Sequence, residues 1–254
     1  MTDKKELCII GFGRLGQTIA PILSDAFTVY VLESDDSKHD AIVVAGCSRI
    51  AKADLPRFDT VVLCVPISQF ETVIEDIAEP LQPSATVIDT CSVKVFPVET
   101  MRKFLPDTVS IVATHPIFGP DSIKAGLSNL NFVLCRVRAE DSIFTFWKDF
   151  WTATGVHVIE TSPEEHDKVM ARTLAMTHYF GRILGALNLR PEPMGNVGYE
   201  ALYKVMLQTN NDSWQLFYDM QTFNPYAKEM RGEVHTAIHS LDNKLRHQGI
   251  DEGI

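Results

Sequence analysis

Short apolar runs alternate with amphipathic segments over the first 160 residues of the chain. One run, Val61-Val62-Leu63-Cys64-Val65, contains no polar residue, which is typical of a strand covered on both faces of a sheet. Helical patterns lie between several runs, as at residues 69–78 and 143–154, so the alternation predicts βαβ units and a largely parallel sheet. The predicted strands are Leu7–Ile10, Thr28–Leu32, Thr60–Cys64, Thr86–Asp89, Ser110–Thr114, Phe132–Val137 and Val156–Ile159.

A helix-start signature marks a change of pattern after residue 160. Ser162 is the expected N-cap, Pro163 takes the first helical position, and Glu165 lies three residues after the cap. His166 follows this cap and is expected on the surface. No strand pattern appears in the rest of the chain. The predicted helices cover residues 163–189, 197–222 and 224–247, separated by Arg190–Gly195 and by Asn224-Pro225.

Composition and charge limit the kinds of partner and the cellular compartment that are expected for this protein. With 23 lysines and arginines against 33 aspartates and glutamates, the net charge is −10, which argues against nucleic acid or an anionic membrane as the main partner. The five cysteines form no C-x-x-C pair, which predicts a reducing, cytoplasmic location without disulfides or a metal site. No apolar run approaches about 18 residues, so neither a signal peptide nor a membrane span is expected.

A glycine-rich segment follows the first predicted strand and opens a helical pattern at residues 15–23. It has the form G-x-G-x-x-G, which is typical of a dinucleotide-binding turn. The first glycine allows the tight turn, the second lets a pyrophosphate approach the backbone, and the third lets the helix pack on the strand. The residues expected at the cofactor are Gly11, Phe12, Gly13, Arg14, Leu15 and Gly16.

An acidic residue ends the second predicted strand, at the spacing that such turns require. Glu33 lies 33 − 11 = 22 residues after Gly11, and a carboxylate there accepts hydrogen bonds from ribose hydroxyls and repels a 2′-phosphate. The next residues, Ser34-Asp35-Asp36, include no arginine, and Lys38 is the nearest cation in the sequence. The pattern therefore favours NAD over NADP. In the alternative, the glycines make only a turn and Glu33 is a solvated strand end.

These patterns together predict an α/β fold. A Rossmann-type, doubly wound and mostly parallel sheet is expected in residues 1–161, followed by a smaller all-helical domain in residues 162–254. Three helices bury little apolar surface by themselves, so the second domain is expected to pack on the first domain, on a second subunit, or on both. A homodimer is the expected assembly.

Polar side chains follow several predicted strands. Each of them comes after or at the end of an apolar run, and ligands bind at the carboxyl edge of an open α/β sheet: Ser68, Ser92, Lys94 and His115. They are expected near the nicotinamide end of a bound cofactor, and Ser68 is expected to bind that cofactor. His115 has the pKa range that suits proton transfer at neutral pH, so it is the expected catalytic residue. In the alternative it is a structural histidine whose ring is satisfied by hydrogen bonds. Ser92 is expected to hydrogen-bond the same substrate oxygen or to orient the imidazole.

The chain resembles the prephenate/arogenate dehydrogenase family of tyrosine biosynthesis, and its helical part is similar to the plant-type branch. The resemblance extends in order over nearly the whole chain. It rests on Gly11–Gly16, Asp89-Thr90-Cys91-Ser92-Val93-Lys94, Thr114-His115-Pro116-Ile117-Phe118-Gly119-Pro120, Glu165-His166-Asp167-Lys168, Thr177-His178-Tyr179-Phe180-Gly181-Arg182, Gly198-Tyr199-Glu200-Ala201-Leu202 and Asp212-Ser213.

The resemblance implies an oxidative decarboxylation of a cyclohexadienol. Hydride leaves C4 for NAD⁺, CO₂ leaves C1, and His115 accepts the proton or a hydrogen bond from the 4-hydroxyl, to which Ser92 also bonds. It also implies substrate binding by His178. The residues expected to bind substrate are Ser92, His115, His178, Lys204 and Asp212.

The resemblance also bears on the choice of substrate. Arogenate-preferring members resemble this chain in carrying aspartate at the position of Asp212, where a carboxylate favours the ammonium group of arogenate over the keto acid prephenate. Prephenate remains the alternative substrate. Bacterial members hold a substrate carboxylate with an arginine, and Lys204 is the nearest counterpart here, with Arg172, Arg182 and Arg231 as alternatives.

Other interpretations remain for several residues. Ser92 and Asp212 are both residue types that cap helices, Lys94 is either a solvated charge or a phosphate or substrate contact, and His178 lies at helical spacing from apolar residues and faces a core in the alternative. Rival functions are another dehydrogenase of this two-domain plan and a non-enzymatic NAD-binding protein. No chorismate mutase or regulatory domain is expected.

Overall fold

The computed structural model describes residues 4–247, and the chain divides into two compact units whose boundary lies between His166 and Asp167. The boundary predicted between residues 161 and 162 lies just before helix α6 (Pro163–Met170), whereas this division falls inside that helix.

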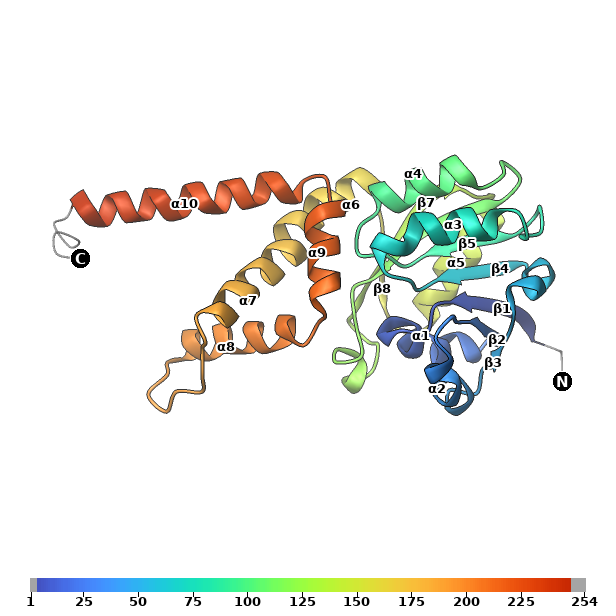
Figure 1. Ribbon diagram of the computed structural model, residues 1–254, viewed down its shortest axis with the longest axis horizontal. Coiled ribbons are helices and arrows are strands. Elements are labelled where there is room, and N and C mark those ends of the chain that lie inside the picture. The colour runs from blue at the N-terminus through green and yellow to red at the C-terminus, as the bar shows by residue number, and fades with distance from the viewer. Residues whose placement is uncertain (1–3, 248–254) are drawn as a thin grey trace. The chain divides into compact units, whose positions relative to one another are not determined.

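An eight-stranded sheet forms the centre of the first unit, in the order β3-β2-β1-β4-β5-β6-β7-β8 (Figure 1). Neighbouring strands pair in parallel except β6 and β7, which are antiparallel. The order runs in opposite directions from β1, so the predicted doubly wound and mostly parallel fold is confirmed. The strands are β1 (Lys5–Ile10), β2 (Phe27–Leu32), β3 (Ser48–Arg49), β4 (Thr60–Leu63), β5 (Thr86–Asp89), β6 (Ser110–Pro116), β7 (Asn131–Arg138) and β8 (His157–Glu160).

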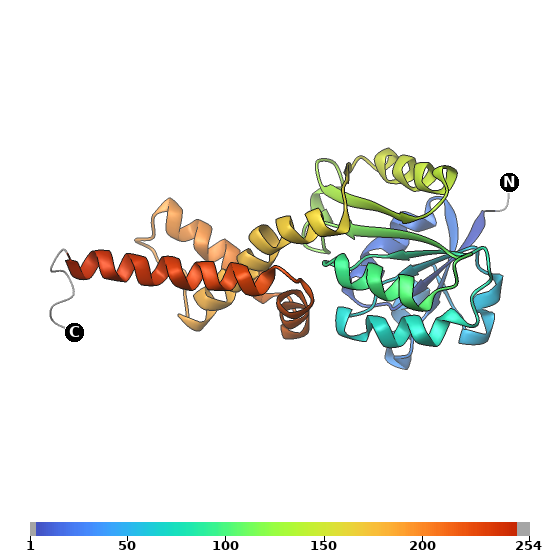
Figure 2. The same cartoon turned by 90° about the horizontal axis from the view of Figure 1, so that it is seen from above.

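Helices cover both faces of this sheet (Figure 2). Helices α1 (Arg14–Ser24) and α5 (Asp141–Ala153) share one apolar core, in which Trp147 stacks on Phe27 of β2 and Trp151 stacks on Phe132 of β7. Helices α3 (Phe70–Ala78) and α4 (Val95–Phe104) contact each other on the opposite face. The sheet is therefore buried on both sides, as its continuous apolar strands predict.

Two elements of the first unit lie where the sequence pattern predicts none. Strand β3 has only two residues, too few to show a period, and helix α2 (His39–Val44) buries only Ile42. Strand β3 nevertheless adds an edge beside β2 and brings Arg49 next to the end of that strand.

The second unit is helical throughout its described residues, but one predicted helix is wrong. The expected helix 197–222 is divided into α8 (Val197–Asn210) and α9 (Trp214–Phe223). The Ser213 hydroxyl accepts the Leu216 N–H at 3.1 Å and starts α9 anew, which satisfies an otherwise unpaired backbone donor. The expected helix 163–189 comprises α6, a π-helical turn at Ala171–Ala175 and α7 (Met176–Ala186).

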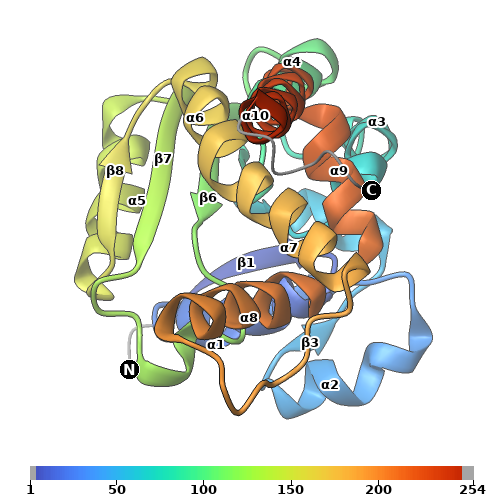
Figure 3. The ribbon, with the colours of Figure 1, turned by 90° about the vertical axis from the view of Figure 1, so that its left-hand side faces the viewer.

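Helices α7 and α8 lie side by side within this unit (Figure 3). They approach closely because residue 181 is glycine: an added Cβ would lie 1.9 Å from the Thr209 hydroxyl oxygen. The last helix, α10 (Ala227–His247), packs Met230 and Val234 against Ala175 near its start. Among residues 4–247, no helix has the length and apolarity needed to cross a membrane.

Candidate active site

The glycine-rich turn lies between β1 and α1, at the carboxyl end of the central strand. Gly11 has φ +90°, and an added Cβ would lie 2.5 Å from the main-chain oxygen of Cys64. An added Cβ on Gly16 would lie 2.5 Å from the Gly11 oxygen, so the first and third glycines permit the tight turn and the close packing of helix on strand. At Gly13, by contrast, no protein atom of the described chain lies within 4 Å of an added Cβ.

The open side of Gly13 fits the pyrophosphate of a dinucleotide. Helix α1 begins there without a side-chain cap and without an acidic residue in its first turn, so its first N–H groups and its dipole favour an anion. Of the other predicted residues of this turn, Phe12 is fully buried and Arg14 pairs with Asp121 at 2.9 Å. The turn therefore fits a dinucleotide cofactor, NAD or NADP.

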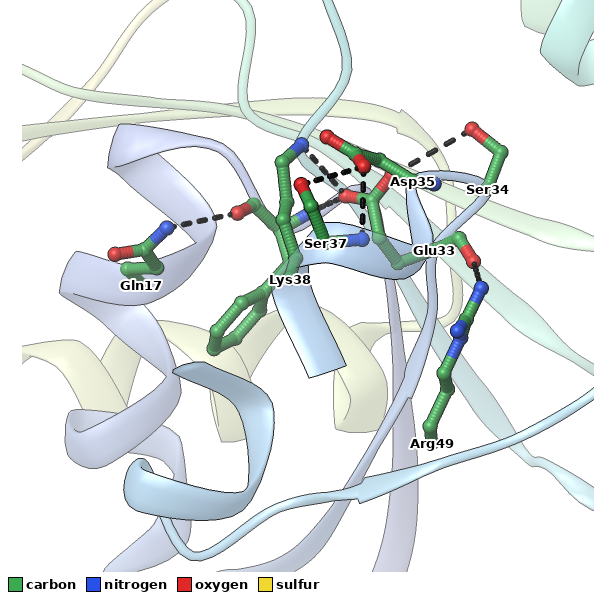
Figure 4. A network of polar contacts seen from close by, with 8 residues as sticks. Gln17, Glu33, Ser34, Asp35, Ser37, Lys38 and Arg49 are labelled. Carbon is green, nitrogen blue, oxygen red and sulfur yellow. Dashed lines mark hydrogen bonds and ion pairs between the residues drawn. The ribbon is translucent and has the colours of Figure 1, made fainter. Parts of the chain in front are cut away.

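Glu33 lies at the end of β2 beside this turn (Figure 4). Its carboxylate accepts the N–H of Phe12 at 2.6 Å and the N–H of Asp35 at 3.0 Å, and it pairs with the Lys38 ammonium at 3.0 Å. Burial raises the pKa of Glu33, but these hydrogen bonds and Lys38 outweigh it and hold the pKa below its usual value. Glu33 is therefore an anion that is anchored to the glycine-rich turn itself.

Arg49 is a second cation near Glu33 that sequence spacing did not reveal. Its guanidinium donates to the Glu33 main-chain oxygen at 2.6 Å (Figure 4). It also pairs with Asp36 at 2.6 Å. Sixteen residues separate Arg49 from Glu33, and only the pairing of β3 with β2 brings them together. The ribose end of the site thus combines one buried carboxylate with two cations.

A buried ion pair connects the ends of β5 and β6. The Lys94 ammonium pairs with the Asp89 carboxylate, and neither side chain is exposed to solvent. Lys94 also donates to the main-chain oxygen of Thr114 at 2.6 Å, and the Thr114 hydroxyl donates to the Asp89 main-chain oxygen at 2.6 Å. The interpretation of Lys94 as a solvated charge is therefore wrong: its ammonium is buried and ties the two strands together just before His115.

His115 lies near the end of β6 and hydrogen-bonds a second histidine. Its Nδ1 atom lies 2.9 Å from Nε2 of His166, and the two side chains are 6% and 2% exposed. The expectation that His166 lies on the surface is wrong. Its position after the cap says only that it is near the start of α6, whereas the folded chain brings its ring against His115 of β6. Within residues 4–247, the Nε2 atom of His115 has no hydrogen-bond partner.

Both histidines are neutral at physiological pH. Burial, the neighbouring His166 and the Lys94 ammonium hold the pKa of His115 well below its usual value. Burial and Lys94 lower the pKa of His166 to about 3. A neutral His115 is a proton acceptor rather than a cation, as a general base requires.

The two serines predicted at this edge differ in their surroundings. Ser92 follows β5, and its buried hydroxyl oxygen has no hydrogen-bond partner in the described chain. It neither caps α4, whose N-cap residue is Lys94, nor bonds the His115 ring. Ser68 is exposed in a 3₁₀ turn, Ile67–Gln69, at the end of β4. Within the described chain, the carboxyl edge thus holds a hydroxyl and a histidine ring nitrogen that have no hydrogen-bond partner.

The second unit holds another buried histidine beside a carboxylate. Nε2 of His178 lies 3.8 Å from Oδ2 of Asp212, and the buried Nδ1 atom has no hydrogen-bond partner among the described residues. Burial and Arg182 lower the pKa of His178, although Asp212 opposes them. Asp212 does not cap α9, because Ser213 does. The structure therefore brings together two of the predicted substrate-binding residues.

The basic residues considered for binding a substrate carboxylate either contact other parts of the chain or lie exposed. Arg182 donates to the Asp212 main-chain oxygen at 2.7 Å and lies 4.2 Å from the Trp214 ring centroid, so it holds the loop between α8 and α9. Lys204 is exposed on α8 and bonds neither His178 nor Asp212. Arg172 pairs with Glu233, and Arg231 donates to the Gln221 side chain and main chain.

The first unit combines a Rossmann-type sheet with a dinucleotide-binding turn, and a neutral histidine lies at the carboxyl edge of that sheet. This combination defines a class of proteins that depend on a nucleotide cofactor. The model of the prephenate dehydrogenase nucleotide-binding domain matches residues 25–160, and that of the TYRAAT1-like C-terminal domain matches residues 183–253. The chain belongs to the prephenate dehydrogenase family, which confirms the resemblance seen in its motifs.

Relatives and solved structures agree with this assignment. The chain is 33% identical to arogenate dehydrogenase 1, chloroplastic, of Arabidopsis thaliana over 96% of its length, but it spans only 39% of that relative. It is 31% identical to arogenate dehydrogenase 2, chloroplastic, of the same plant, covering 94% of this chain and 70% of the relative. A Saccharomyces cerevisiae relative named prephenate dehydrogenase [NADP(+)] is 23% identical over 94% of this chain and 57% of the relative.

The fold is shared with prephenate dehydrogenase from Aquifex aeolicus in complex with hydroxyphenyl propionate and NAD⁺. That structure superposes with a TM-score of 0.77 at 18% identity, covering 98% of this chain and 93% of that one. The similarity shows that the two chains share their fold.

Proposed function

We propose that this protein is an arogenate dehydrogenase that converts arogenate to tyrosine and CO₂ with NAD⁺ as the oxidant. The observation that carries the proposal is the neutral, buried His115 at the carboxyl edge of a dinucleotide-binding sheet, with its Nε2 atom available to a substrate hydroxyl. Membership of the family, with arogenate dehydrogenases among the relatives, supports the same reaction.

The reaction requires an acceptor for the 4-hydroxyl proton of the substrate. His115 Nε2 accepts this proton as the C4–H bond breaks and the oxygen begins to form a carbonyl. The C1–carboxylate bond then breaks, its electron pair completes the aromatic ring, and the phenolic oxygen takes the proton back from His115. When bound, the nicotinamide supplies the hydride acceptor. The Ser92 hydroxyl, which has no hydrogen-bond partner among the residues that the structure describes, donates to the same oxygen.

The cofactor in this proposal is NAD rather than NADP. The Glu33 carboxylate is ionised and lies at the end of β2, where it accepts ribose hydroxyls and repels a 2′-phosphate. The pairing of Lys38 and Arg49 with Glu33, Asp36 and the adjacent main chain reduces their attraction for a phosphate.

Arogenate is the substrate in this proposal because it carries an ammonium group where prephenate carries a keto group. Asp212 offers a carboxylate that is 30% exposed at its side chain, and His178 beside it has an unpartnered nitrogen for a hydrogen bond. Prephenate is the second candidate, since relatives of both names occur in the family.

We also propose a homodimer formed through the second unit. Beyond its contacts with Ala175, α10 carries Ile238, Leu241 and Leu245 on exposed positions at helical spacing. Such an apolar stripe is stabilised when a second copy covers it. The five free cysteines keep a reducing compartment as the expected location.

The direct test mixes purified protein with NAD⁺ and either arogenate or prephenate and follows NADH at about 340 nm. We expect NADH, tyrosine and CO₂ in equal amounts with arogenate, a smaller kcat/KM with prephenate, and a kcat at least about 100-fold lower for His115→Asn. Absence of NADH with both substrates would overturn the proposal and favour another dehydrogenase or a non-enzymatic NAD-binding protein.

A further inference from the structure

We propose that His166 is a positioning residue that holds the His115 ring in the tautomer with its proton on Nδ1, so that Nε2 presents a lone pair to the substrate. The inference rests on the proposed function for its catalytic meaning. The histidine pair itself is a property of the first unit and is tested separately below.

The two rings are placed by different elements of that unit. His115 lies on β6 and is in register with Val133 of β7, so its backbone is held by the sheet. His166 lies in the first turn of α6, where the Ser162 main-chain oxygen accepts its N–H at 3.0 Å and the Ser162 hydroxyl accepts the Glu165 N–H at 3.2 Å. A capped helix start and a sheet strand therefore hold the pair from both sides, and the ring centroids lie 5.1 Å apart at 75°.

The charges around the pair favour two neutral rings, with one proton in the hydrogen bond between them. Lys94 is fully buried, and its ammonium disfavours a positive charge on either histidine. The Oδ1 atom of Asp89 pairs with Lys94 and accepts the Cys91 N–H at 2.9 Å, and the carboxylate bonds neither histidine. Because both rings are neutral, the 2.9 Å contact contains one N–H donor and one nitrogen acceptor.

Only one of the two possible arrangements suits the reaction. If His166 donates from Nε2, then His115 carries its proton on Nε2 and meets the substrate as a donor. If His115 donates from Nδ1, then its Nε2 atom is an acceptor for the 4-hydroxyl. As the proton reaches Nε2, His115 becomes a cation, and the acceptor nitrogen of His166 stabilises that charge through the same hydrogen bond.

His166 therefore orients the His115 ring, which is one of the two roles that the sequence suggested for Ser92. Ser92 makes no hydrogen bond to the His115 ring, and His166 makes the one side-chain hydrogen bond that His115 has within residues 4–247. In this respect the pair follows the general rule that a histidine base is oriented by the partner of its second nitrogen.

The first test reads the tautomer without any reaction. Full-length protein labelled with ¹⁵N-histidine is examined by two-bond ¹⁵N–¹H correlation, with the His115 signals assigned by their loss in His115→Asn. We expect a protonated Nδ1 and an unprotonated Nε2 on His115 in the wild type, and partial or complete reversal in His166→Phe. An Nε2-protonated His115 in the wild type overturns the inference, whatever the protein is found to catalyse.

The second test separates positioning from structural support. His166→Phe keeps a ring but removes the acceptor, whereas His166→Gln keeps an amide oxygen near the position of Nε2. We expect kcat to fall roughly 10- to 100-fold in the phenylalanine variant, with the KM for substrate and the Kd for NAD⁺ nearly unchanged, and to recover most of that loss in the glutamine variant. His239→Phe, at an exposed position on α10, is the matched control and is expected to behave as wild type.

The outcomes of the two tests are distinct. Equal losses in the phenylalanine and glutamine variants, or a wild-type kcat in His166→Phe, contradict the positioning role. If the phenylalanine variant does not fold, the wild-type tautomer and the glutamine variant still decide the question. A protein with the expected tautomer and no activity on either substrate contradicts the proposed function and leaves the tautomer assignment standing.

Discussion

Lys94 donates a hydrogen bond at 2.6 Å to the main-chain oxygen of Thr114, the residue that immediately precedes His115 on β6. The same ammonium pairs with Asp89 on β5, so one buried cation holds the ends of two neighbouring strands in register. The position of His115, the proposed base, thus depends on the fully buried ammonium of Lys94.

Breaking this pair is expected to cost a large part of the stability of the protein. Lys94→Met leaves the Asp89 carboxylate buried without its counter-charge and should lower the free energy of unfolding by about 3–5 kcal/mol. Urea unfolding measures the change. The double variant Asp89→Asn/Lys94→Met should recover much of it, and Lys103→Met, which breaks an exposed pair with Glu71, should cost at most about 1 kcal/mol. Equal losses for Lys94 and Lys103 would contradict the role of burial.

The buried histidines should make stability depend on pH below the ordinary histidine pKa. The folded-state pKa values of His115 and His166 are lowered, so below about pH 6.5 the unfolded chain binds protons that the folded chain does not. The contribution of these histidines to stability is therefore complete above that pH. Below it, the free energy of unfolding falls by about 1.4 kcal/mol per pH unit for each such histidine.

His166→Gln tests this linkage. Relative to wild type, its unfolding free energy should fall less steeply between about pH 6 and pH 5, by roughly 1.4 kcal/mol per unit, and should run parallel to wild type above about pH 7.5. Parallel curves over the whole range would mean that His166 is protonated in the folded protein.

Gly13 is expected to matter for cofactor binding and not for folding. It has φ −71°, which alanine adopts readily, and its Cβ direction is open. Gly13→Ala should therefore leave the unfolding transition nearly unchanged while weakening NAD⁺ binding at least about tenfold, because the methyl group occupies the pyrophosphate's path. Gly232→Ala, at an equally open helical position in α10, should stabilise by about 0.5–1 kcal/mol without changing the Kd for NAD⁺ measured by calorimetry.

Glu33 is expected to set the preference for NAD over NADP. Glu33→Ser removes the carboxylate and releases Lys38, with Arg49 close by, so the ratio of kcat/KM for NADP to that for NAD should rise at least about tenfold. Adding Lys38→Met should reverse part of that rise. Glu6→Gln, which alters a carboxylate paired with Arg57 away from the turn, serves as the control. An unchanged ratio in Glu33→Ser would remove Glu33 from cofactor choice.

Asp212 is expected to set the choice between arogenate and prephenate. Asp212→Asn keeps the size of the side chain and removes the charge, so kcat/KM for arogenate should fall about tenfold or more relative to that for prephenate. The measurement is the ratio of the two kcat/KM values, with Asp242→Asn on exposed α10 as the control. If both substrates change in proportion, the ammonium group is recognised elsewhere.

The sequence by itself determined the features that arise within one element or one turn. Apolar β-branched runs predicted seven of the eight strands, because each buried strand shows its environment in its own residues. The spacing of Gly11, Gly13 and Gly16 predicted the turn, because its steric demands are local. The motif residues also identified the family, while the roles of His115, Ser92, His178, Lys204 and Asp212 remain predictions.

Tertiary structure decided which distant side chains meet. His166 lies 51 residues from His115, Arg49 lies 16 residues from Glu33, and Lys94 lies 20 residues from the Thr114 oxygen to which it donates. None of these contacts leaves a period or a spacing in the sequence, because strand order and helix packing create them only when the chain folds. The candidate base was visible in the sequence, and the ring that orients it was not, since a histidine's burial and partner depend on elements that the local pattern does not describe.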